Sequence, residues 1–229
     1  MGIRNGLAGL CVLAACALSA WAQQPPVVYE NDFEKGIDGF EMTDANAWAA
    51  AEDESSRSKV LALVGSSKYE PPVRSPLNIA RVKGLSVSDF TLEVDVRQTG
   101  KEYGHRDMCF FFGYEDPSHF YYVHLATKAD DHANSIFIVN GAPRLSIAKE
   151  RTDGTDWASG WHKIRITRDA ASGVVEVFFD NMEKPVMRAT DLTFPAGQIG
   201  FGSFDDVGNF DNVRIFGKKV DAKGSSTKP

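Results

Sequence analysis

Short apolar runs recur along the chain at intervals of roughly eight to twelve residues, and turn-forming residues separate them. This spacing is typical of strands in a β-sandwich or barrel, and no long helical period interrupts it. The pattern predicts strands over residues 60–64, 90–97, 108–114, 120–126, 136–139, 161–168, 174–180, 198–203 and 210–216.

Two of these segments show the strand pattern most clearly. In residues 90–97, FTLEVDVR, apolar and polar side chains alternate, so one face of that strand is expected to contact water. Residues 163–179 are predicted to form a hairpin, because the short polar turn 169–173 joins two strand-like runs. We therefore predict an all-β chain folded as a two-sheet antiparallel β-sandwich.

The stretch 118–144 holds the candidate chemistry. Alternation along 120–126 places Tyr122 and His124 on one face of a strand, opposite the more apolar face. A charged loop, KADDHAN at 128–134, follows this strand. If the apolar face enters the core, the Tyr122/His124 pair and the loop's charges face solvent or a ligand on one rim of the sandwich.

The first residues have the form of a secretory signal peptide. One positive charge precedes an apolar run over 7–18, and the sequence AWA at 20–22 suits cleavage after residue 22. We expect residues 1–22 to be removed and the protein to be secreted or periplasmic. The alternative is a lipoprotein anchored at Cys16. The apolar run is shorter than the ~20 residues of a spanning helix, so no integral membrane span is expected.

Cleavage would leave residues 23–217 as a single domain, followed by a polar tail, 218–229, that we expect to be disordered. Cys109 is then the only cysteine, so an intramolecular disulfide is impossible. Cys109 lies in the apolar sequence MCFFFGY, where a buried and inert thiol is expected. No cluster of His and Cys has the spacing of a zinc site, so zinc is not expected.

The formal net charge of -6 argues against nucleic acid and anionic membrane surfaces as partners. We expect a monomer without an organic cofactor. The three consecutive phenylalanines that begin at Phe110 cannot all face the core, so one of them is a candidate stacking surface for a sugar. Burial beneath a loop is the alternative, and Phe110 is taken as the candidate.

Several longer motifs are spread over the predicted domain: DFE at 32–34, DFTLEVDVR at 89–97, GWHKIRITR at 160–168, VEVFFDN at 175–181 and GQIGFGSFDDVGNFDNVRIF at 197–216. With these motifs the chain resembles the concanavalin A-like lectin/glucanase superfamily, including laminin-G-like modules and the 3-keto-disaccharide hydrolase family. The resemblance implies a jelly roll of two curved antiparallel sheets that handles carbohydrate.

The resemblance also implies a structural calcium ion that clamps the first and last strands. Calcium requires six to eight oxygen ligands, and Glu34 and Asp211 are the leading acidic candidates. Asp32, Asp205 and Asp206 are possible substitutes. The alternative is that these acids are solvated and protect the edges of a sheet.

In related jelly rolls the concave sheet carries the substrate groove, so the face bearing Tyr122 and His124 is the expected site. These two groups, with His132, are candidates for acid–base chemistry, and Arg144 is a candidate for neutralising a carboxylate or enolate. The reaction would be β-elimination from a uronic acid or cleavage of a 3-keto sugar, by a lyase or a glycoside hydrolase. Further ligand-binding candidates are His105, Arg97, Lys128, Asp130, Asn134 and Phe110.

A retaining glucanase would need two carboxylates about 5 Å apart, and only Glu93 and Asp95 have the acid-x-acid spacing here. The wet face of a strand supplies such pairs by chance, so we rank that reaction low. A non-catalytic carbohydrate-binding module and a purely structural exported protein remain as alternatives to an enzyme.

Overall fold

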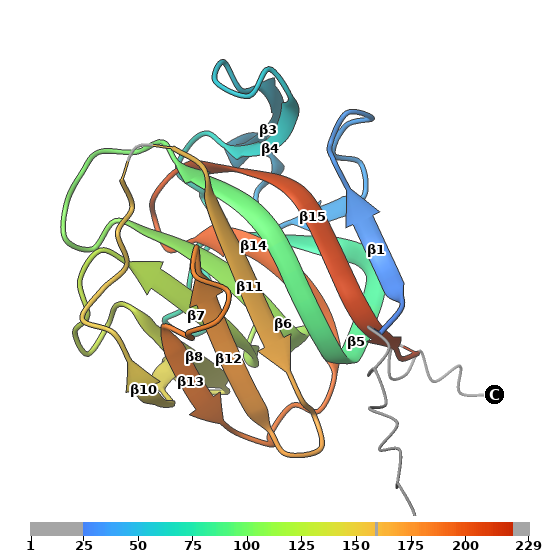
Figure 1. Ribbon diagram of the computed structural model, residues 1–229, viewed down its shortest axis with the longest axis vertical. Coiled ribbons are helices and arrows are strands. Elements are labelled where there is room, and N and C mark those ends of the chain that lie inside the picture. The colour runs from blue at the N-terminus through green and yellow to red at the C-terminus, as the bar shows by residue number, and fades with distance from the viewer. Residues whose placement is uncertain (1–24, 159, 222–229) are drawn as a thin grey trace, which may run out of the picture.

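The computed structural model describes residues 25–158 and 160–221, and it folds them into two antiparallel sheets packed face to face (Figure 1). The predicted signal peptide and Cys16 lie outside the described residues.

Every predicted strand is present, and the predicted two-sheet sandwich is confirmed. No described helix is long and apolar enough to cross a membrane. The elements are β1 (Val27–Asn31), β2 (Phe40–Met42), η1 (Ala45–Ala47), β3 (Trp48–Glu52), β4 (Lys59–Leu63), β5 (Asn78–Gln98), β6 (Asp107–Asp116), β7 (His119–Ala126), β8 (Ser135–Asn140), β9 (Leu145–Ser146), β10 (Ala148–Arg151), β11 (His162–Arg168), β12 (Val174–Phe179), β13 (Met187–Thr190), β14 (Gly197–Ser203) and β15 (Gly208–Lys219).

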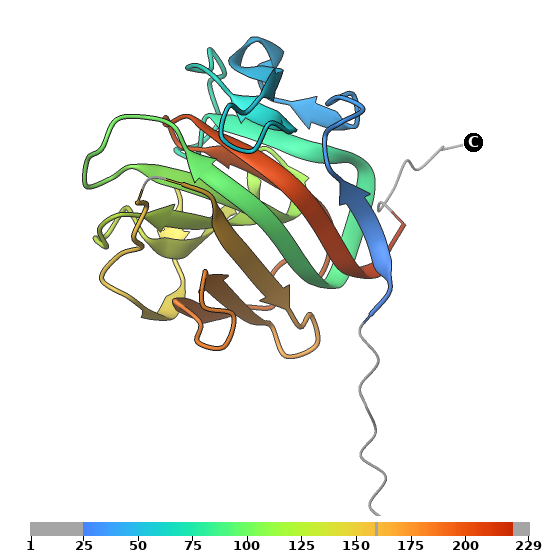
Figure 2. The same cartoon turned by 45° about the horizontal axis from the view of Figure 1, so that its top comes forward.

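Strand β5 belongs to both sheets. Its first half pairs with β14 and β2, and its second half pairs with β11 and β15. Figure 2 shows the long strand bending as it passes from one sheet to the other. Between the halves Gly84 has a φ of 66°, a conformation that glycine adopts without steric cost, and the register with β14 shifts beside it.

We name the two sheets by their outer faces. The aromatic sheet contains the first half of β5 with β14, β6, β7, β8 and β9. The charged sheet contains the second half of β5 with β11, β12, β13, β10 and β15, and β1, β4 and β3 extend it beyond β15. The main core fills the space between the sheets. Val94 and Ile166 enter it from the charged sheet, and Phe110, Val123 and Phe201 enter it from the aromatic sheet.

The outer face of the aromatic sheet is buried as well. Its middle row stacks the rings of Phe111, Tyr122 and Phe137, whose centroids lie 5.9 and 5.1 Å apart. Segment 64–77 crosses this face, and its Val73 packs against the rings. We call this layer the second core, and its buried members are Ile79, Cys109, Phe111, Tyr114, Phe120, Tyr122, Phe137 and Val139.

The separate strands that the sequence pattern missed are short or lie at sheet edges. The pattern also missed residues 78–89, the first half of β5. Strands β2, β9 and β13 have three, two and four residues, too few for an alternating pattern to be recognised. Strand β3 is rich in alanine, which is not typical of strands. Strand β15 continues to Lys219, two residues into the predicted tail.

Asp53 ties the turn between β3 and β4 to the outer face of the charged sheet. Its carboxylate is 4% exposed and accepts hydrogen bonds from Arg97 Nη1 at 3.0 Å and Asn209 Nδ2 at 2.8 Å. Burial alone would raise the pKa of Asp53. Hydrogen bonds from Ser55, Asn209 and Ser56 outweigh this effect and hold the pKa well below its ordinary value.

We predict that Asp53→Asn lowers the free energy of unfolding by about 2 kcal/mol at pH 7, because the half-buried Arg97 guanidinium loses the charge of its buried partner. The folded-state pKa of Asp53 is depressed, so its contribution is complete above the unfolded pKa of about 3.9 and disappears as the pH falls further. Urea unfolding of both proteins between pH 7 and pH 2 measures this difference. Glu54→Gln, at the exposed neighbouring residue, should change stability by less than ~0.5 kcal/mol. An equal effect of both substitutions would contradict the prediction.

Candidate functional site

The structure confirms the predicted face of Tyr122 and His124 but not the predicted opening beside it. Tyr121 and Val123 enter the main core, and Tyr122 lies on the opposite side, as the alternation indicated. Tyr122 is 0% and His124 is 4% exposed, because the second core covers that side. The expectation that this pair faces an open groove is therefore wrong.

Phe110 requires a similar correction. It belongs to the main core, is 0% exposed and packs edge to face against Phe201 and Phe210. Phe111 lies on the opposite face of the sheet, because successive side chains of a strand alternate between its faces, but it is also buried. Neither ring is available for stacking on a sugar, so burial, the alternative reading, holds.

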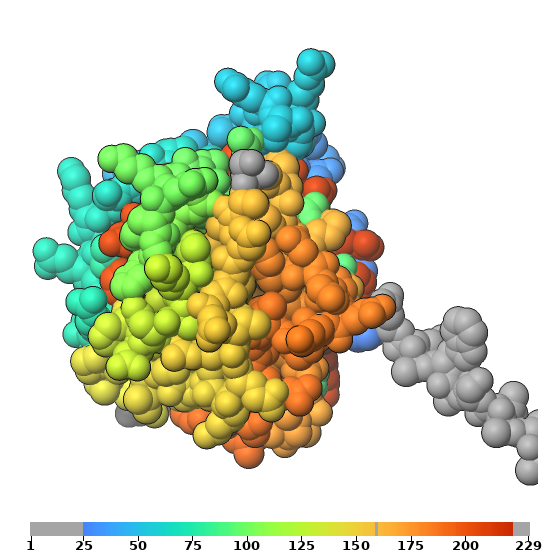
Figure 3. Space-filling view, turned by 60° about the vertical axis from the view of Figure 1, so that its left-hand side comes forward, coloured from blue at the N-terminus to red at the C-terminus, as the bar shows by residue number. Residues whose placement is uncertain are grey.

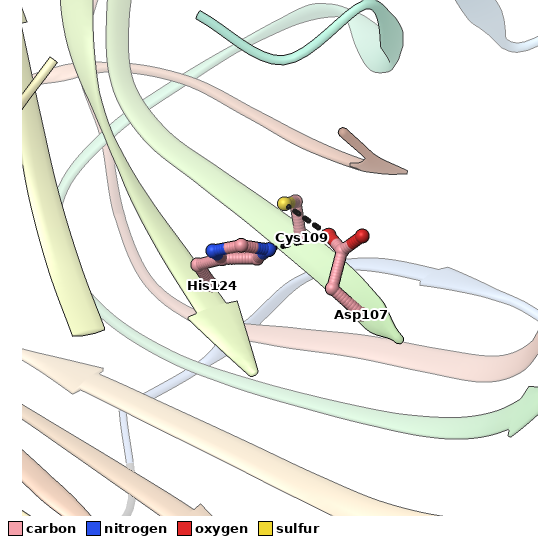
Figure 4. Close-up of side chains that lie close together, drawn as sticks. All are labelled: Asp107, Cys109 and His124. Atoms are coloured by element: carbon pink, nitrogen blue, oxygen red, sulfur yellow. Dashed lines mark hydrogen bonds and ion pairs between the residues drawn. The ribbon is translucent and has the colours of Figure 1, made fainter. Parts of the chain in front are cut away.

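His124 belongs to a buried cluster with Asp107 and Cys109, and Figure 4 shows the three side chains pointing toward one another. Cys109 and His124 are direct partners in the β6–β7 register, and Asp107 lies two residues before Cys109 on the same face. Asp107 Oδ2 is 3.0 Å from His124 Nε2 and 3.0 Å from Cys109 Sγ. The imidazole Nδ1 lies 3.1 Å from the carbonyl oxygen of His132.

Two more carboxylates extend this cluster toward the surface. Oxygens of Asp107, Asp205 and Asp206 lie within 4.8 Å of one another, which makes a possible acidic metal site. Asp206 Oδ2 accepts hydrogen bonds from the Tyr103 hydroxyl at 2.7 Å and the Asp107 amide at 2.9 Å. Asp205 is exposed, whereas Asp107 and Asp206 are buried.

Burial dominates the electrostatics of this cluster. It raises the pKa of Asp206 to about 7, with a further rise from the nearby Asp107 charge. Burial and Asp107 also raise the pKa of the Cys109 thiol, which is therefore neutral without a bound metal. For Asp107 itself burial is outweighed by the neighbouring imidazole and its hydrogen bonds, so the pKa of this carboxyl is lowered.

Three loops gather at the end of the sandwich next to this cluster, and we call this region the loop end: residues 99–106, 127–134 and 152–158. Backbone hydrogen bonds join the loops, from Lys128 to Gly104 at 2.9 Å and from Ala129 to Asp153 at 2.8 Å. Figure 3 shows the corresponding green and yellow segments side by side on one face. A cavity of about 350 Å³ opens between them, lined by Glu102, Tyr103, Gly104, Arg106, Thr127, Lys128, Asp156, Trp157 and Ala158.

Several predicted ligand-binding residues belong to the loop end. His105 Nε2 and Asp130 Oδ2 are 2.6 Å apart, and both side chains are exposed. Lys128 lines the cavity. Asn134 is instead 0% exposed and has a φ of 49°; its side chain accepts from the Ala126 amide and donates to the Thr152 carbonyl, which gives it a structural role.

His132 and Arg144 approach the buried cluster in an unexpected way. His132 is exposed, and its backbone carbonyl, not its imidazole, contacts both His124 and Arg144 Nη2, the latter at 3.2 Å. The Arg144 guanidinium lies over the ring of Phe204, 4.3 Å from its centroid. The four predicted catalytic residues are thus neighbours, but two of them are sealed in the second core.

Arg97 lies elsewhere, on the outer face of the charged sheet. It lines a polar cleft of about 500 Å³ together with Asp53 and Asn209. Its Nη1 already contacts both oxygens of Asp53 and the Ser55 hydroxyl. A ligand there would have to break the Asp53 contact that fixes the β3–β4 turn.

The predicted calcium ligands Glu34 and Asp211 contact the same short segment. Glu34 Oε1 accepts from the Lys59 amide at 2.9 Å, and Asp211 Oδ2 accepts from the Ser58 hydroxyl at 2.8 Å. The Lys59 ammonium lies 3.2 Å from the Glu34 carbonyl oxygen, where a bound cation would need that oxygen. Among the described residues neither acid joins a group of three possible metal ligands. The calcium site stays a prediction, and these donors fit it poorly.

Sequence reasoning missed Tyr103 and Asp107, and it named Asp206 only as a possible substitute calcium ligand. Tyr103 is an aromatic residue in a polar, glycine-containing segment, TGKEYGH, and that exposed context is a usable signal for a ligand contact. Asp107 had no such signal. Its partners at 124 and 206 are distant in sequence and meet it only through strand pairing and a loop.

Comparison by sequence found no matching family model and no significant match among curated proteins. Solved structures do match. The carbohydrate-binding module CBM66 from Bacillus subtilis aligns with a TM-score of 0.56 and 19% identity, over 79% of this chain and 96% of that one. The carbohydrate recognition domain of Emp47p aligns with a TM-score of 0.57 and 13% identity, over 86% and 98%. The VIP36 exoplasmic/lumenal domain, in a Ca²⁺/Man3GlcNAc-bound form, aligns with a TM-score of 0.54 and 11% identity, over 84% and 92%. The chain therefore has the concanavalin A-like jelly-roll fold.

We predict that Tyr122→Phe leaves the free energy of unfolding unchanged or raises it by about 1 kcal/mol, because the buried Tyr122 hydroxyl makes no well-aligned hydrogen bond, although the Arg144 guanidinium lies near it. The adjacent Tyr121→Phe is the matched control. The Tyr121 hydroxyl donates to Asp191 and accepts from the Phe194 amide, so its loss should cost about 1–3 kcal/mol. Urea unfolding at pH 7 measures both values. A large loss in Tyr122→Phe would show that this hydroxyl has a partner after all.

Proposed function

We propose that this concanavalin A-like jelly roll is an exported, non-catalytic carbohydrate-binding protein, and that one sugar unit occupies the loop-end cavity against the ring of Tyr103. The main support for the proposal is that the Tyr103 ring is exposed while its hydroxyl is held in place. Tyr103 is 46% exposed, while its hydroxyl is held 2.7 Å from Asp206 Oδ2. An exposed ring with a fixed orientation can stack on the apolar face of a sugar at little cost in conformational entropy.

The cavity surrounds this ring with groups that suit sugar hydroxyls. Glu102 and Asp156 offer carboxylate acceptors, and Lys128 offers an ammonium donor, all along its lining. Charged groups of both signs can bond a neutral sugar, whose hydroxyls both donate and accept. The volume of about 350 Å³ lies at the small end of ligand sites, which favours a single sugar unit over a long chain.

The fold supports the same class of ligand. Two of the matching structures are named a carbohydrate-binding module and a carbohydrate recognition domain, and a third was solved with Man3GlcNAc bound. At these identities the likeness establishes architecture alone, so the choice of cavity rests on Tyr103 and its neighbours.

Binding without turnover agrees better with the buried groups than catalysis does. An acid–base residue must reach the proton that it transfers within about 3 Å or through one water. Tyr122 is a buried member of the second core, His124 packs against it, and neither side chain lines the loop-end cavity. His132 is exposed, but its side chain faces no partner among the other predicted catalytic residues.

The test begins with a panel of immobilised polysaccharides and free oligosaccharides, assayed for binding and for released product. For the glycan that binds, we predict that Tyr103→Ala weakens the affinity about thirtyfold, the effect of losing ~2 kcal/mol from an aromatic anchor. Leu192→Ala removes another exposed apolar side chain, 60% exposed and outside the cavity, and should leave affinity unchanged. Isothermal titration calorimetry measures both. Binding that is insensitive to Tyr103→Ala, or product release by the wild type, would overturn the proposal.

A further inference from the structure

We propose that Asp107, Cys109 and His124 form a binding site for a divalent transition metal, with Zn²⁺ the best fit. The three side chains lie side by side on the outer face of β6 and β7, and each is at most 4% exposed. None of them contacts the loop-end cavity, so the inference does not depend on carbohydrate binding.

The spacing of the donor atoms suits a single ion. Asp107 Oδ2 lies 3.0 Å from both Cys109 Sγ and His124 Nε2, and all three donors lie within 4.8 Å of one another. Zinc binds oxygen and nitrogen at about 2.0–2.2 Å and sulfur at about 2.3 Å, which places tetrahedral ligand atoms about 3.3–3.8 Å apart. Side-chain movements of a few tenths of an ångström would therefore admit an ion between them.

The imidazole is already oriented as a metal ligand. Its Nδ1 lies 3.1 Å from the His132 carbonyl, which only accepts, so Nδ1 carries a proton and donates it. This contact leaves Nε2 facing Asp107 and Cys109. Nε2 is buried and has no aligned hydrogen-bond partner, although Asp107 Oδ2 lies at hydrogen-bond distance. A ring nitrogen fixed by a carbonyl on the other side is the usual arrangement of a metal-binding histidine.

Hydrogen bonds from neighbouring groups also fix the orientation of the Asp107 carboxylate. Asp107 Oδ1 accepts from the Ser203 hydroxyl at 3.0 Å, and Oδ2 accepts from the Phe204 amide at 3.1 Å. The Phe204 amide takes one lone pair of Oδ2, and the other lone pair is left for the side of Cys109 and His124. Hydrogen bonds to a metal-binding side chain, such as those from Ser203 and Phe204, fix the geometry of a site before the ion arrives.

The donor set selects the metal. Thiolate and imidazole favour zinc and the neighbouring transition metals, whereas calcium and magnesium prefer oxygen ligands only. Three protein ligands leave a tetrahedral ion one position for water. Binding would replace the thiol proton: the Cys109 S–H bond breaks, a metal–sulfur bond forms, and the proton passes to solvent.

An exposed carboxylate lies close to the site on its acidic side. Asp205 is exposed, and its carboxylate lies within 4.8 Å of the oxygens of Asp107 and Asp206. An ion would therefore approach Asp107 from the side of Asp205. The competing interpretation is a closed hydrogen-bonded cluster in which the Cys109 thiol donates to Asp107 and no ion binds.

The experiment uses the full chain with Cys11→Ser and Cys16→Ser, so that Cys109 is its only thiol. After treatment with a chelator, the protein is titrated with Co²⁺, whose absorption spectrum reports a thiolate ligand and tetrahedral geometry. We expect one equivalent of Co²⁺ to produce a thiolate-to-metal charge-transfer band, which an equimolar amount of Zn²⁺ removes and a large excess of Ca²⁺ does not. Adding Cys109→Ser should abolish the band, and Glu34→Gln, at the predicted calcium ligand, should leave it intact.

X-ray absorption of the zinc-loaded parent keeps the test decisive if Cys109→Ser does not fold. We expect one sulfur neighbour at about 2.3 Å and nitrogen or oxygen neighbours at about 2.0–2.2 Å. The closed hydrogen-bonded cluster predicts no stoichiometric uptake of Co²⁺ or Zn²⁺ by the folded parent. Three results would each overturn the proposal. They are the absence of stoichiometric metal uptake, a zinc coordination shell without sulfur, and a charge-transfer band that persists in folded Cys109→Ser.

Discussion

Burial of both faces of the aromatic sheet is the constraint on which the rest of this structure depends. A sheet with one wet face tolerates polar side chains freely, but a sheet between two apolar layers must give each of them a partner. The outer row of β6 and β7 carries Asp107, Cys109 and His124 among stacked rings, and there the polar atoms contact one another. The second core thus explains why a carboxylate, a thiol and an imidazole that are separate in the sequence share one small volume.

The same constraint closes the outer face of the aromatic sheet to ligands. Segment 64–77 and Phe204 occupy the place that an open groove would need, and the rings beneath them are sealed. The loop end is different because its loops bond to one another through their backbones, which leaves side chains such as Lys128 free to line a cavity. A rigid sandwich that presents variable loops at one end is a common way to combine stability with recognition.

Much of the fold was predictable from the sequence because burial on one side of a strand leaves an alternating pattern. The alternation correctly assigned Tyr122 and His124 to the side opposite Val123. It could not show whether that side is wet, since the segment that packs against it through Val73, residues 64–77, has no strand pattern. The spacing rules for zinc do not register the buried cluster of Asp107, Cys109 and His124 for a related reason. They detect ligands close in sequence, whereas Cys109 and His124 are fifteen positions apart and meet as register partners.

The buried cluster and the loop-end cavity are joined through one carboxylate. Asp206 Oδ2 accepts from both the Tyr103 hydroxyl and the Asp107 amide, so the orientation of the exposed ring follows from the position at which β6 begins. Burial that raises the pKa of Asp206 to about 7 also makes its two donors difficult to replace with water. A contact that fixes Asp107 therefore also helps to fix Tyr103, because both residues donate to the same oxygen of Asp206. The orientation of this exposed ring at the loop end is in this sense set by polar groups that pair inside the sandwich.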